Sequence, residues 1–333
     1  MSEPRTRVEA ALDLLHEKPR AIVLLHGGIN STVFHLRMES GHDLVAKAYP
    51  VERSDHRDRL STEVLACYSL RLVGMRDVPE SIVVDSVHRI GFFGYVEGER
   101  PTPASIGKKD VRAAAEFVLS IQAHRGELGL AGFQRASEAC YSLPEHVKVI
   151  EDRIAALLAA WSESSEARRF VSDEVRPCLT EVLESGPPYE GRVPDAERIL
   201  SPSDFGFHNS IRRPDGVYTF LDLEYFGWDD PAKLLCDAFL QPDFPIPAAH
   251  RPLFFETVWR GLGSHAYLPR RFERLYPLLA IKWALIVLNA FLPERRGVAD
   301  PARLAGQMRK ARAAISEARR TMKARDLSGV LAS

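Results

Sequence analysis

The chain has 333 residues, which is long enough for one large domain or for two lobes that each bury a core. Hydrophobic residues make up 45% of it and charged residues 27%, the balance of a globular protein, so disordered and fibrous classes are excluded. Its 44 basic and 45 acidic residues give a formal net charge of −1. The chain therefore lacks the overall positive field of a nucleic-acid-binding protein, and we expect no nucleic-acid partner.

Cysteine usage and hydropathy favour the cytoplasm as the compartment. The four cysteines form no C-x-x-C pair, which fits core thiols in a reducing compartment better than disulfides or a zinc site. Residues 1–20 are interrupted by charge and lack the apolar stretch of a secretory signal. The most apolar run, 276–292, contains Lys282 and is shorter than the roughly 20 residues that a bilayer requires, so we expect a buried helix and no membrane partner.

Periodicity in the first hundred residues predicts a small sheet with few helices. Strand-like alternation is interrupted by the glycine turn 26–31 and resumes after it, and Lys47 is the single cation in a later apolar strand. The glycine- and proline-rich stretch 97–101 is a candidate linker between lobes. The expected elements are a helix at 8–16, strands at 21–25, 33–36 and 44–49, a helix at 57–72, and a hairpin of strands at 82–87 and 90–96.

Beyond the linker the pattern changes from strands to amphipathic helices, without an internal repeat or a low-complexity tract. The expected helices cover 108–123, 144–161, 167–183, 231–240, 252–262, 275–291 and 301–323, and short strands are expected near 199–200 and 219–221.

The strongest chemical signal is a set of three polar residues. Asp204 and Asn209 stand five residues apart, and Asp222 follows Asp204 by eighteen. Phosphoryl transfer uses this arrangement: one aspartate accepts the proton of the attacking hydroxyl, while an asparagine and a second aspartate hold magnesium. Any one of the three is equally well explained as a turn or strand-end residue. Two loops joined by a hairpin would bring all three side chains together.

This motif resembles that of the aminoglycoside phosphotransferase and choline kinase group of small-molecule kinases. The pattern of that group is H-G-D-x-x-x-x-N, then D-x-D or D-x-E, then a Gly-Asp-Pro turn, and this chain has Asp204 to Asn209, Asp222-Leu-Glu224 and 227–231. Pro202-Ser203 replaces the His-Gly pair. The resemblance implies an α+β, bilobal protein-kinase-like fold, with a nucleotide-binding lobe at 1–98 and a mainly helical catalytic lobe at 99–333.

Two residues of the first lobe extend the resemblance. A kinase fold requires a strand lysine that binds the α- and β-phosphates and a helix glutamate that pairs with it, and Lys47 and Glu63 follow the glycine turn in that order. The ion pair would also reduce the cost of burying the ammonium group. The alternative is a lysine that extends to solvent and an unrelated surface glutamate.

The glycine turn and the linker are candidates for nucleotide contacts. Gly28, Asn30 and Ser31 lie where backbone N–H groups could approach phosphates, although an ordinary hairpin turn explains them too. The turn matches neither a P-loop nor a dinucleotide fingerprint. By resemblance, the Gly94 carbonyl and the Val96 amide would face adenine.

Other polar residues allow two interpretations each. His208 is either a general base or, as we prefer, a residue that packs the loop. Asp237 either braces the catalytic loop or caps a helix. The acidic Glu224, Asp229 and Asp230 either attract a cationic substrate or are simply solvated.

The predicted function is transfer of the γ-phosphoryl group of ATP, with Mg²⁺, to a hydroxyl of a small molecule such as a sugar, an aminoglycoside-like compound or an amino alcohol. The absence of D-F-G and A-P-E after Asp222 argues against a protein kinase. The alternative is a non-catalytic pseudokinase that binds a nucleotide or metabolite, suggested by the missing His-Gly pair.

Overall fold

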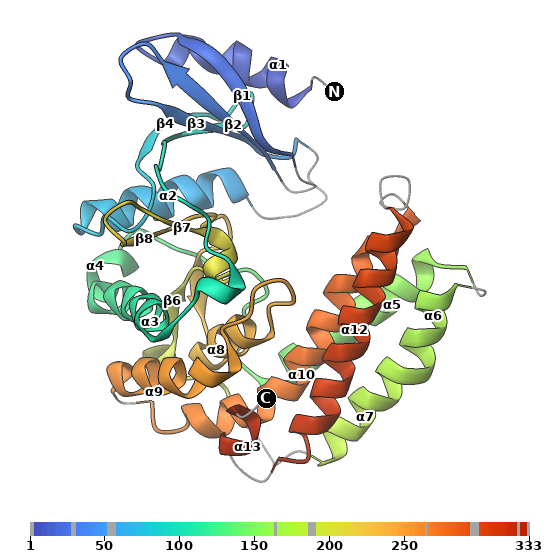
Figure 1. Ribbon diagram of the computed structural model, residues 1–333. Coiled ribbons are helices and arrows are strands. Elements are labelled where there is room, and N and C mark those ends of the chain that lie inside the picture. The colour runs from blue at the N-terminus through green and yellow to red at the C-terminus, as the bar shows by residue number, and fades with distance from the viewer. Residues whose placement is uncertain are drawn as a thin grey trace. The chain divides into compact units, whose positions relative to one another are not determined.

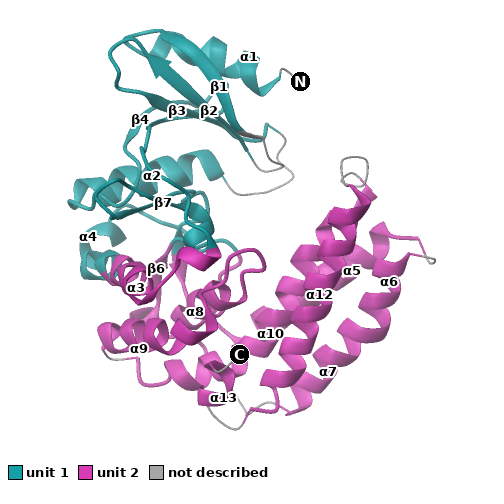
Figure 2. Cartoon of the chain, viewed as in Figure 1, with its two compact units in different colours: residues 1–102, 120–137, 202–227 teal, residues 103–119, 138–201, 228–333 magenta. Residues whose placement is uncertain are grey.

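A computed structural model of the chain describes residues 3–27, 31–51, 58–162, 165–185, 191–263, 265–293, 300–324 and 327–331 (Figure 1). The chain divides into two compact units (Figure 2). Unit 1 comprises Met1–Thr102, Ser120–Ser137 and Pro202–Gly227, and unit 2 comprises Pro103–Leu119, Glu138–Ser201 and Trp228–Ser333. Unit 1 thus contains the whole predicted first lobe together with two later segments, one of which carries the Asp204 motif.

The strands are β1 Pro19–Gly27, β2 Thr32–Met38, β3 Leu44–Ala48, β4 Ser81–Asp85, β5 Ile90–Gly94, β6 Ile199–Ser201, β7 Ser210–Arg212, β8 Tyr218–Phe220 and β9 Gly227–Asp229. The α-helices are α1 Pro4–Ala11, α2 Arg59–Leu72, α3 Lys108–Ala123, α4 Arg125–Gly129, α5 Leu143–Ala160, α6 Glu166–Phe170, α7 Arg176–Ser185, α8 Pro231–Leu240, α9 Arg251–Leu262, α10 Leu268–Leu288, α12 Pro301–Thr321 and α13 Leu327–Leu331.

Unit 1 is built on a five-stranded antiparallel sheet with the strand order β1-β2-β3-β5-β4. In this register Lys47 of β3 lies opposite Val33 of β2 and Gly91 of β5. The lysine is therefore in the central strand of the sheet, where its neighbours on both sides are other strands. With five antiparallel strands and many helices, the chain has the α+β class that its sequence predicts.

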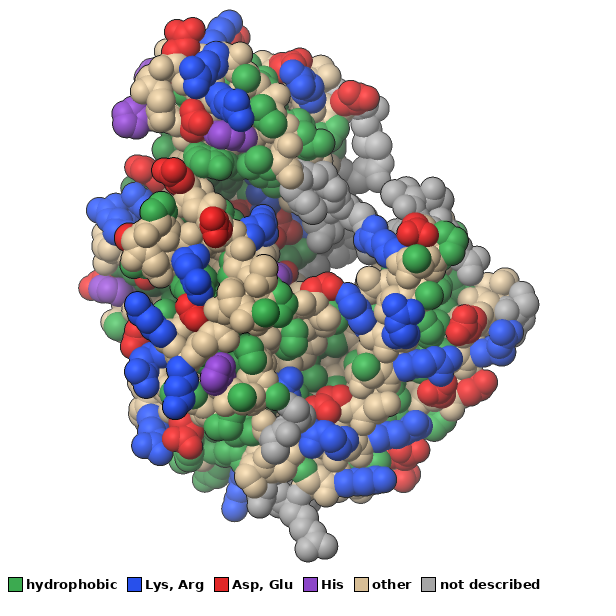
Figure 3. All heavy atoms as spheres, in the orientation of Figure 1, with side chains coloured by type: hydrophobic (Ala, Val, Ile, Leu, Met, Phe, Trp, Pro, Cys, Tyr) green, Lys and Arg blue, Asp and Glu red, His purple; other side chains and the backbone are tan. Residues whose placement is uncertain are grey.

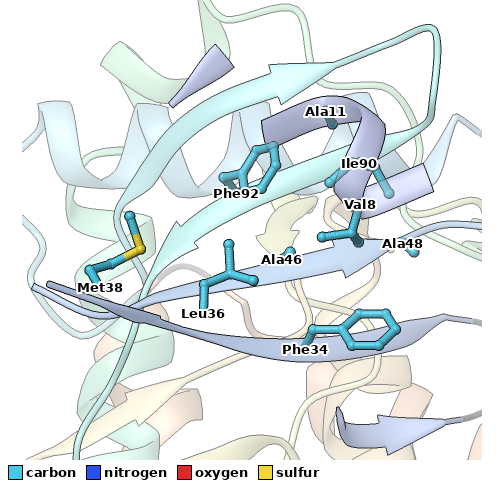
Figure 4. Packing of buried hydrophobic residues seen from close by; sticks show 9 residues of the cluster. All are labelled: Val8, Ala11, Phe34, Leu36, Met38, Ala46, Ala48, Ile90 and Phe92. Carbon is cyan, nitrogen blue, oxygen red and sulfur yellow. The ribbon is translucent and has the colours of Figure 1, made fainter. Parts of the chain in front are cut away.

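Helix α1 covers one face of this sheet (Figure 4). Side chains one residue apart in a strand point to opposite faces, so alternate residues of β2 and β3 reach this core. The burial of these apolar side chains is the main force that holds α1 on the sheet. The cluster consists of Val8 and Ala11 from α1, Phe34, Leu36 and Met38 from β2, Ala46 and Ala48 from β3, and Ile90 and Phe92 from β5.

The segment Pro202–Gly227 joins unit 1 through backbone pairing. Glu99 and Arg212 form an isolated antiparallel bridge, and the Phe220 N–H donates to the Asp77 carbonyl. Gly98, with φ of +148°, permits this pairing because a Cβ atom there would lie 2.3 Å from the Arg212 carbonyl oxygen. The hairpin β7–β8 therefore places the Asp204 to Asn209 motif in the same unit as Lys47.

Unit 2 is mainly helical. Helix α12 packs along α10, which also contacts α5, α7 and α8. Among the described residues, one helical stretch, Leu268–Phe291, is long and apolar enough to cross a membrane, but 78% of its apolar window is buried inside the structure. That burial is typical of the core helix of a soluble protein, which agrees with the buried helix predicted for this run.

Most predicted elements are present, and several differ. Helix α1 begins at Pro4, which suits the first helical position, and ends at Ala11 rather than near residue 16. Helix α10 begins at Leu268, seven residues before the predicted start, because two arginines of its first turns, Arg271 and Arg274, are buried and hydrogen-bonded rather than solvated. The short strands β7 and β9 were not predicted. Basic and acidic side chains intermingle on the visible face (Figure 3), in line with the near-zero net charge.

Candidate active site

Lys47 and Glu63 form the ion pair that their order in the sequence predicts. The Lys47 Nζ lies 2.6 Å from the Glu63 Oε2, and both residues are buried, with exposures of 6% and 4%. Glu63 is on α2, where Asp58 caps the helix by accepting from the Ser61 N–H, so the helix start is fixed near the site. The Tyr49 hydroxyl donates to the same Glu63 oxygen at 2.5 Å.

Two further carboxylates meet Lys47. Its Nζ lies 2.5 Å from the Asp222 Oδ1 and 3.0 Å from the Glu224 Oε2. Glu224 is 2% exposed, and the Arg59 Nη1 donates to its other oxygen at 3.1 Å. Carboxylate and ammonium groups at these distances and this burial interact strongly, since little water screens them. One lysine and one arginine thus face three carboxylates, and this excess of acid is suited to an added cation.

Burial and charge perturb the pKa values in this cluster. Burial, assisted by Asp222 and Glu224, raises the pKa of Glu63 to about 7, against the opposing effect of Lys47. Burial by itself lowers the pKa of Lys47, but the surrounding carboxylates outweigh it and raise that pKa well above its usual value. Burial raises the pKa of Asp222, yet Lys47 outweighs burial and the net pKa is lowered. Lys47 is therefore a persistent cation beside a persistent Asp222 anion.

The catalytic motif forms a short loop between β6 and β7. The Asn209 Nδ2 donates to the Asp204 main-chain oxygen at 3.0 Å, and the Leu221 N–H donates to the Asn209 carbonyl at 2.8 Å. The second bond places Asp222 next to the loop. The Asp204 side chain is 35% exposed, so its carboxylate can meet a ligand. The hairpin thus brings Asp204, Asn209 and Asp222 to one end of β7 and β8.

The carboxylates around Lys47, Glu63 from α2 and Asp222 and Glu224 from the segment after β8, offer oxygen atoms suited to a magnesium ion. One oxygen from each of Glu63, Asp222 and Glu224 lies within 4.8 Å of the others. Asn209 directs its amide nitrogen at the Asp204 main chain, which leaves its Oδ1 as the atom able to bind metal. An all-oxygen donor set of this kind is what Mg²⁺ prefers.

The structure places the predicted nucleotide residues unevenly. Gly28 and Asn30 lie outside the described residues, and Ser31 is partly buried just before β2. Gly94 and Val96 border a pocket of about 460 Å³ whose lining also includes Glu80. Lys47 and Asp222 are not in that lining, so the pocket is separate from the Lys47 cluster. The adenine contacts of Gly94 and Val96 stay a prediction.

Two of the alternative interpretations are corrected. Asp237 does not brace the catalytic loop: it accepts from Lys282 and Trp283 and pairs with Lys233 inside unit 2. The three acids Glu224, Asp229 and Asp230 are buried and ion-paired, so they are not solvated loop charges.

Sequence reasoning missed Arg59 and Tyr49 as members of the cluster. Each is bonded to a carboxylate of the site, but neither stands in a recognisable pattern. Glu224 carried a usable signal, because it stands with Asp222 in the D-x-E element of the motif.

Comparison with known structures identifies the class of fold. Many solved structures match, among them choline/ethanolamine kinases, macrolide 2'-phosphotransferases and aminoglycoside phosphotransferases, which are small-molecule kinases with the protein-kinase-like fold. The chain therefore has that fold, and the predicted resemblance is confirmed at the level of fold. No family model matches the sequence. No curated protein matches it.

The individual neighbours cover nearly the whole chain at low identity. A choline/ethanolamine kinase family protein from Mesorhizobium loti is 18% identical with a TM-score of 0.62, covering 98% of this chain and 97% of its own. The choline kinase LicA from Streptococcus pneumoniae is 15% identical with a TM-score of 0.61, covering 95% and 99%. The amicoumacin kinase hAmiN, solved in complex with AMP-PNP, Ca²⁺ and Ami, is 13% identical with a TM-score of 0.60, covering 95% and 94%.

Proposed function

We propose that the protein is an ATP- and Mg²⁺-dependent phosphotransferase that moves the γ-phosphoryl group of ATP to a hydroxyl of a small molecule, such as a sugar, an aminoglycoside-like compound or an amino alcohol. The observation that carries the proposal is the assembly, within unit 1, of the Lys47–Glu63 ion pair and the Asp204, Asn209 and Asp222 constellation. The cytoplasm, where ATP is supplied and the buried cysteines stay reduced, is the proposed compartment.

Asp204 acts on the acceptor in this mechanism. Its partly exposed carboxylate accepts the proton of the acceptor hydroxyl and orients the oxygen, which bonds to the γ-phosphorus as the bond from that phosphorus to the bridging oxygen of ADP breaks. Positioning supplies much of the rate, because two reactants are held in line.

Lys47 and the metal ligands act on the nucleotide. Lys47, held by Glu63, binds the α- and β-phosphates and leaves Asp222 when it does so. Asn209 and Asp222 would hold Mg²⁺, which neutralises charge on the phosphates when bound.

The sheet offers a surface for the nucleobase. Val23 and Leu25 of β1 are 37% and 50% exposed, and Tyr95, which follows β5, stacks on His35 of β2 with ring centroids 4.1 Å apart. Covering exposed apolar groups with a planar base is favourable. Two of the structural neighbours support a nucleotide ligand, since one was solved with AMP-PNP and an aminoglycoside phosphotransferase was solved with ADP.

The test is a pair of isosteric variants assayed with Mg·ATP and a panel of alcohols, with the product followed by its phosphate mass. Asp204→Asn should lose about 10²–10⁴-fold in turnover, because the general base is gone. Asp222→Asn should lose turnover together with metal-dependent nucleotide binding. Turnover by Asp204→Asn at the wild-type rate would refute the role of Asp204. Binding of Mg·ATP by the wild type without transfer to any alcohol would support the pseudokinase alternative instead.

A further inference from the structure

We propose that Ser203 and His208 are positioning residues that hold the Asp204 carboxylate, one on each side of it along the chain. This inference rests on the proposed function and deepens it. It addresses how the catalytic loop is secured in a chain where Pro202-Ser203 stands in place of a His-Gly pair.

Ser203 has an unusual backbone for its residue type. Its φ is +67°, in the left-handed region that favours glycine, and the residue is 7% exposed. A residue with a Cβ atom pays about 1–2 kcal/mol for that conformation. The Ser203 Oγ donates to the Ser137 carbonyl at 3.1 Å, and such a bond is worth about 0.5–1.5 kcal/mol. The hydroxyl thus offsets the strain and fixes the backbone that enters Asp204.

The Ser203 bond leads to a second support. The Ser137 N–H donates to the Tyr225 carbonyl at 3.1 Å, so the segment that accepts from Ser203 is itself tied to the turn that follows Asp222. The catalytic aspartate and the metal-binding aspartate are therefore held against one common segment of unit 1.

His208 fixes the side chain of Asp204 rather than its backbone. The His208 Nε2 lies 3.1 Å from the Asp204 Oδ1, while the Asn209 Nδ2 lies 3.4 Å from the Oδ2. The imidazole packs so closely on Gly206 that a Cβ atom there would lie 2.8 Å from the His208 Nδ1. That Nδ1 is buried and has no hydrogen-bond partner among the described residues.

This packing specifies the donor. A hydrogen on the buried Nδ1 would be an unpartnered donor, which costs more than an unpartnered lone pair there. The neutral ring therefore carries its hydrogen on Nε2 and donates it to Asp204. Oδ1 then accepts from His208 at 3.1 Å, whereas Oδ2 has only the longer 3.4 Å contact with Asn209, so Oδ2 is the more open oxygen for the acceptor hydroxyl. His208 is thus a loop-packing residue, as the sequence favoured, and its packing serves to aim the base.

The experiment compares matched variants of the full chain in turnover. Ser203→Ala and Ser203→Gly both remove the hydroxyl, but only glycine relieves the backbone strain. We expect both to lower kcat about 10-fold or more with an unchanged KM for ATP, because misplacement of a catalytic group by about 1 Å costs up to about 10²-fold. Wild-type kcat in Ser203→Gly would show that Ser203 has only a conformational role and would overturn this part of the proposal.

For His208 the matched pair is His208→Gln and His208→Leu. The glutamine amide can donate to Asp204 from nearly the position of Nε2, whereas leucine cannot. We expect kcat to fall in His208→Leu and to be largely restored in His208→Gln, with the KM for ATP unchanged in both. Equal activity of the two variants would overturn the role of His208.

Crystal structures of Ser203→Ala and His208→Leu give a readout that does not depend on turnover. The inference expects the Asp204 main chain to shift in Ser203→Ala and the Asp204 carboxylate to leave its wild-type rotamer in His208→Leu. An Asp204 that keeps its wild-type position in both variants would overturn it. Absence of transfer by the wild type would instead count against the proposed function, so the two failures are distinguishable.

Discussion

Two residues of the candidate active site have a strained backbone. Four non-glycine residues among those described have a positive φ, and two of them, Ser203 and Asp222, belong to the proposed active site. Asp222 has φ of +62°, a conformation that aspartate tolerates better than most residues and that turns its carboxylate toward Lys47. Strain of this kind persists only where the surroundings fix it, which hydrogen bonds do for Ser203 and the ion pair does for Asp222.

His146 of α5 should make the folding stability of the protein depend on pH. It is 3% exposed, and burial, followed by the neighbouring Lys282 and Lys233, lowers its pKa to about 3. In the unfolded chain its pKa returns to about 6.5, so below that pH the unfolded state binds the extra proton and stability falls as the pH falls. Lowering the pH from 7.5 to 5 should therefore lower the free energy of unfolding by about 2 kcal/mol through this residue.

Urea unfolding across this pH range measures the effect. His146→Leu should flatten the pH dependence of the unfolding free energy, whereas His42→Gln, at an exposed histidine, should leave it as in the wild type. Identical pH profiles for the wild type and His146→Leu would show that His146 does not contribute.

Helices α8 and α10 are joined by buried charges as well as apolar packing. Asp237 of α8 accepts from the Lys282 Nζ at 3.0 Å and from the Trp283 Nε1 at 2.8 Å, and all three come from helix faces that pack together. Lys233 bonds Asp229 at 2.8 Å one turn earlier. Buried charges without partners are costly, so each buried lysine in these helices requires an acidic partner nearby.

Asp237→Asn should destabilise the protein by about 3–5 kcal/mol, because it leaves the buried Lys282 ammonium with only the more distant Glu138 carboxylate, at 3.9 Å, as an anion. Unfolding by urea provides the measurement. The control is Asp152→Asn, which removes the exposed pair with Lys148 and should change stability by less than about 1 kcal/mol. Adding Lys282→Met to Asp237→Asn should recover part of the loss, and a double variant no more stable than Asp237→Asn would contradict the assignment.

The elements that sequence predicted well are those with strong periodicity. Helix α8 has the predicted bounds, and the sheet strands lie within one or two residues of theirs, because apolar alternation marks them directly. The start of α10 was missed because Arg271 is buried by pairing with Glu197, a contact with a distant residue that no local pattern reveals. Strand β7 is hidden by its brevity and its arginine.

The main residues of the candidate site could be predicted from the sequence, whereas the residues that hold them in place could not. Lys47 and Glu63 follow from strand and helix signals, and the hairpin between Asn209 and Asp222 follows from their spacing. The roles of Ser203 and His208 depend on a backbone angle and on packing against Gly206, which exist only once the loop is folded.

Across the whole molecule, unit 1 is assembled from three separate stretches of chain. The lysine strand comes from the first stretch and the aspartates from the last, with 175 residues separating Lys47 from Asp222. Contacts of such long range must be closed at an entropic cost before they stabilise the fold. A ligand that bridges these stretches would therefore report on the integrity of the entire unit.

Mg·AMP-PNP should be such a ligand. A compound that binds only the folded state at about 100 times its dissociation constant adds about 2.7 kcal/mol to the unfolding free energy. We therefore expect a concentration-dependent rise in melting temperature, measured by calorimetry with a nonhydrolysable nucleotide so that turnover does not interfere. The physical reason is the excess of acid around Lys47, which the metal relieves as the phosphates take the ammonium.

Two variants distinguish the proposed metal ligand, Asp222, from the proposed general base, Asp204, in this measurement. Asp222→Asn should lose most of the stabilisation, because it removes a proposed metal ligand that also pairs with Lys47. Asp204→Asn should keep it, since that carboxylate faces the acceptor rather than the nucleotide. Nucleotide with EDTA in place of magnesium is the control and should stabilise less than the full complex. A wild-type melting temperature that stays constant over the whole range of Mg·AMP-PNP concentrations would argue against a nucleotide site at Lys47. Equal loss of the nucleotide-induced stabilisation in Asp204→Asn and Asp222→Asn would contradict the separate roles proposed for the two aspartates.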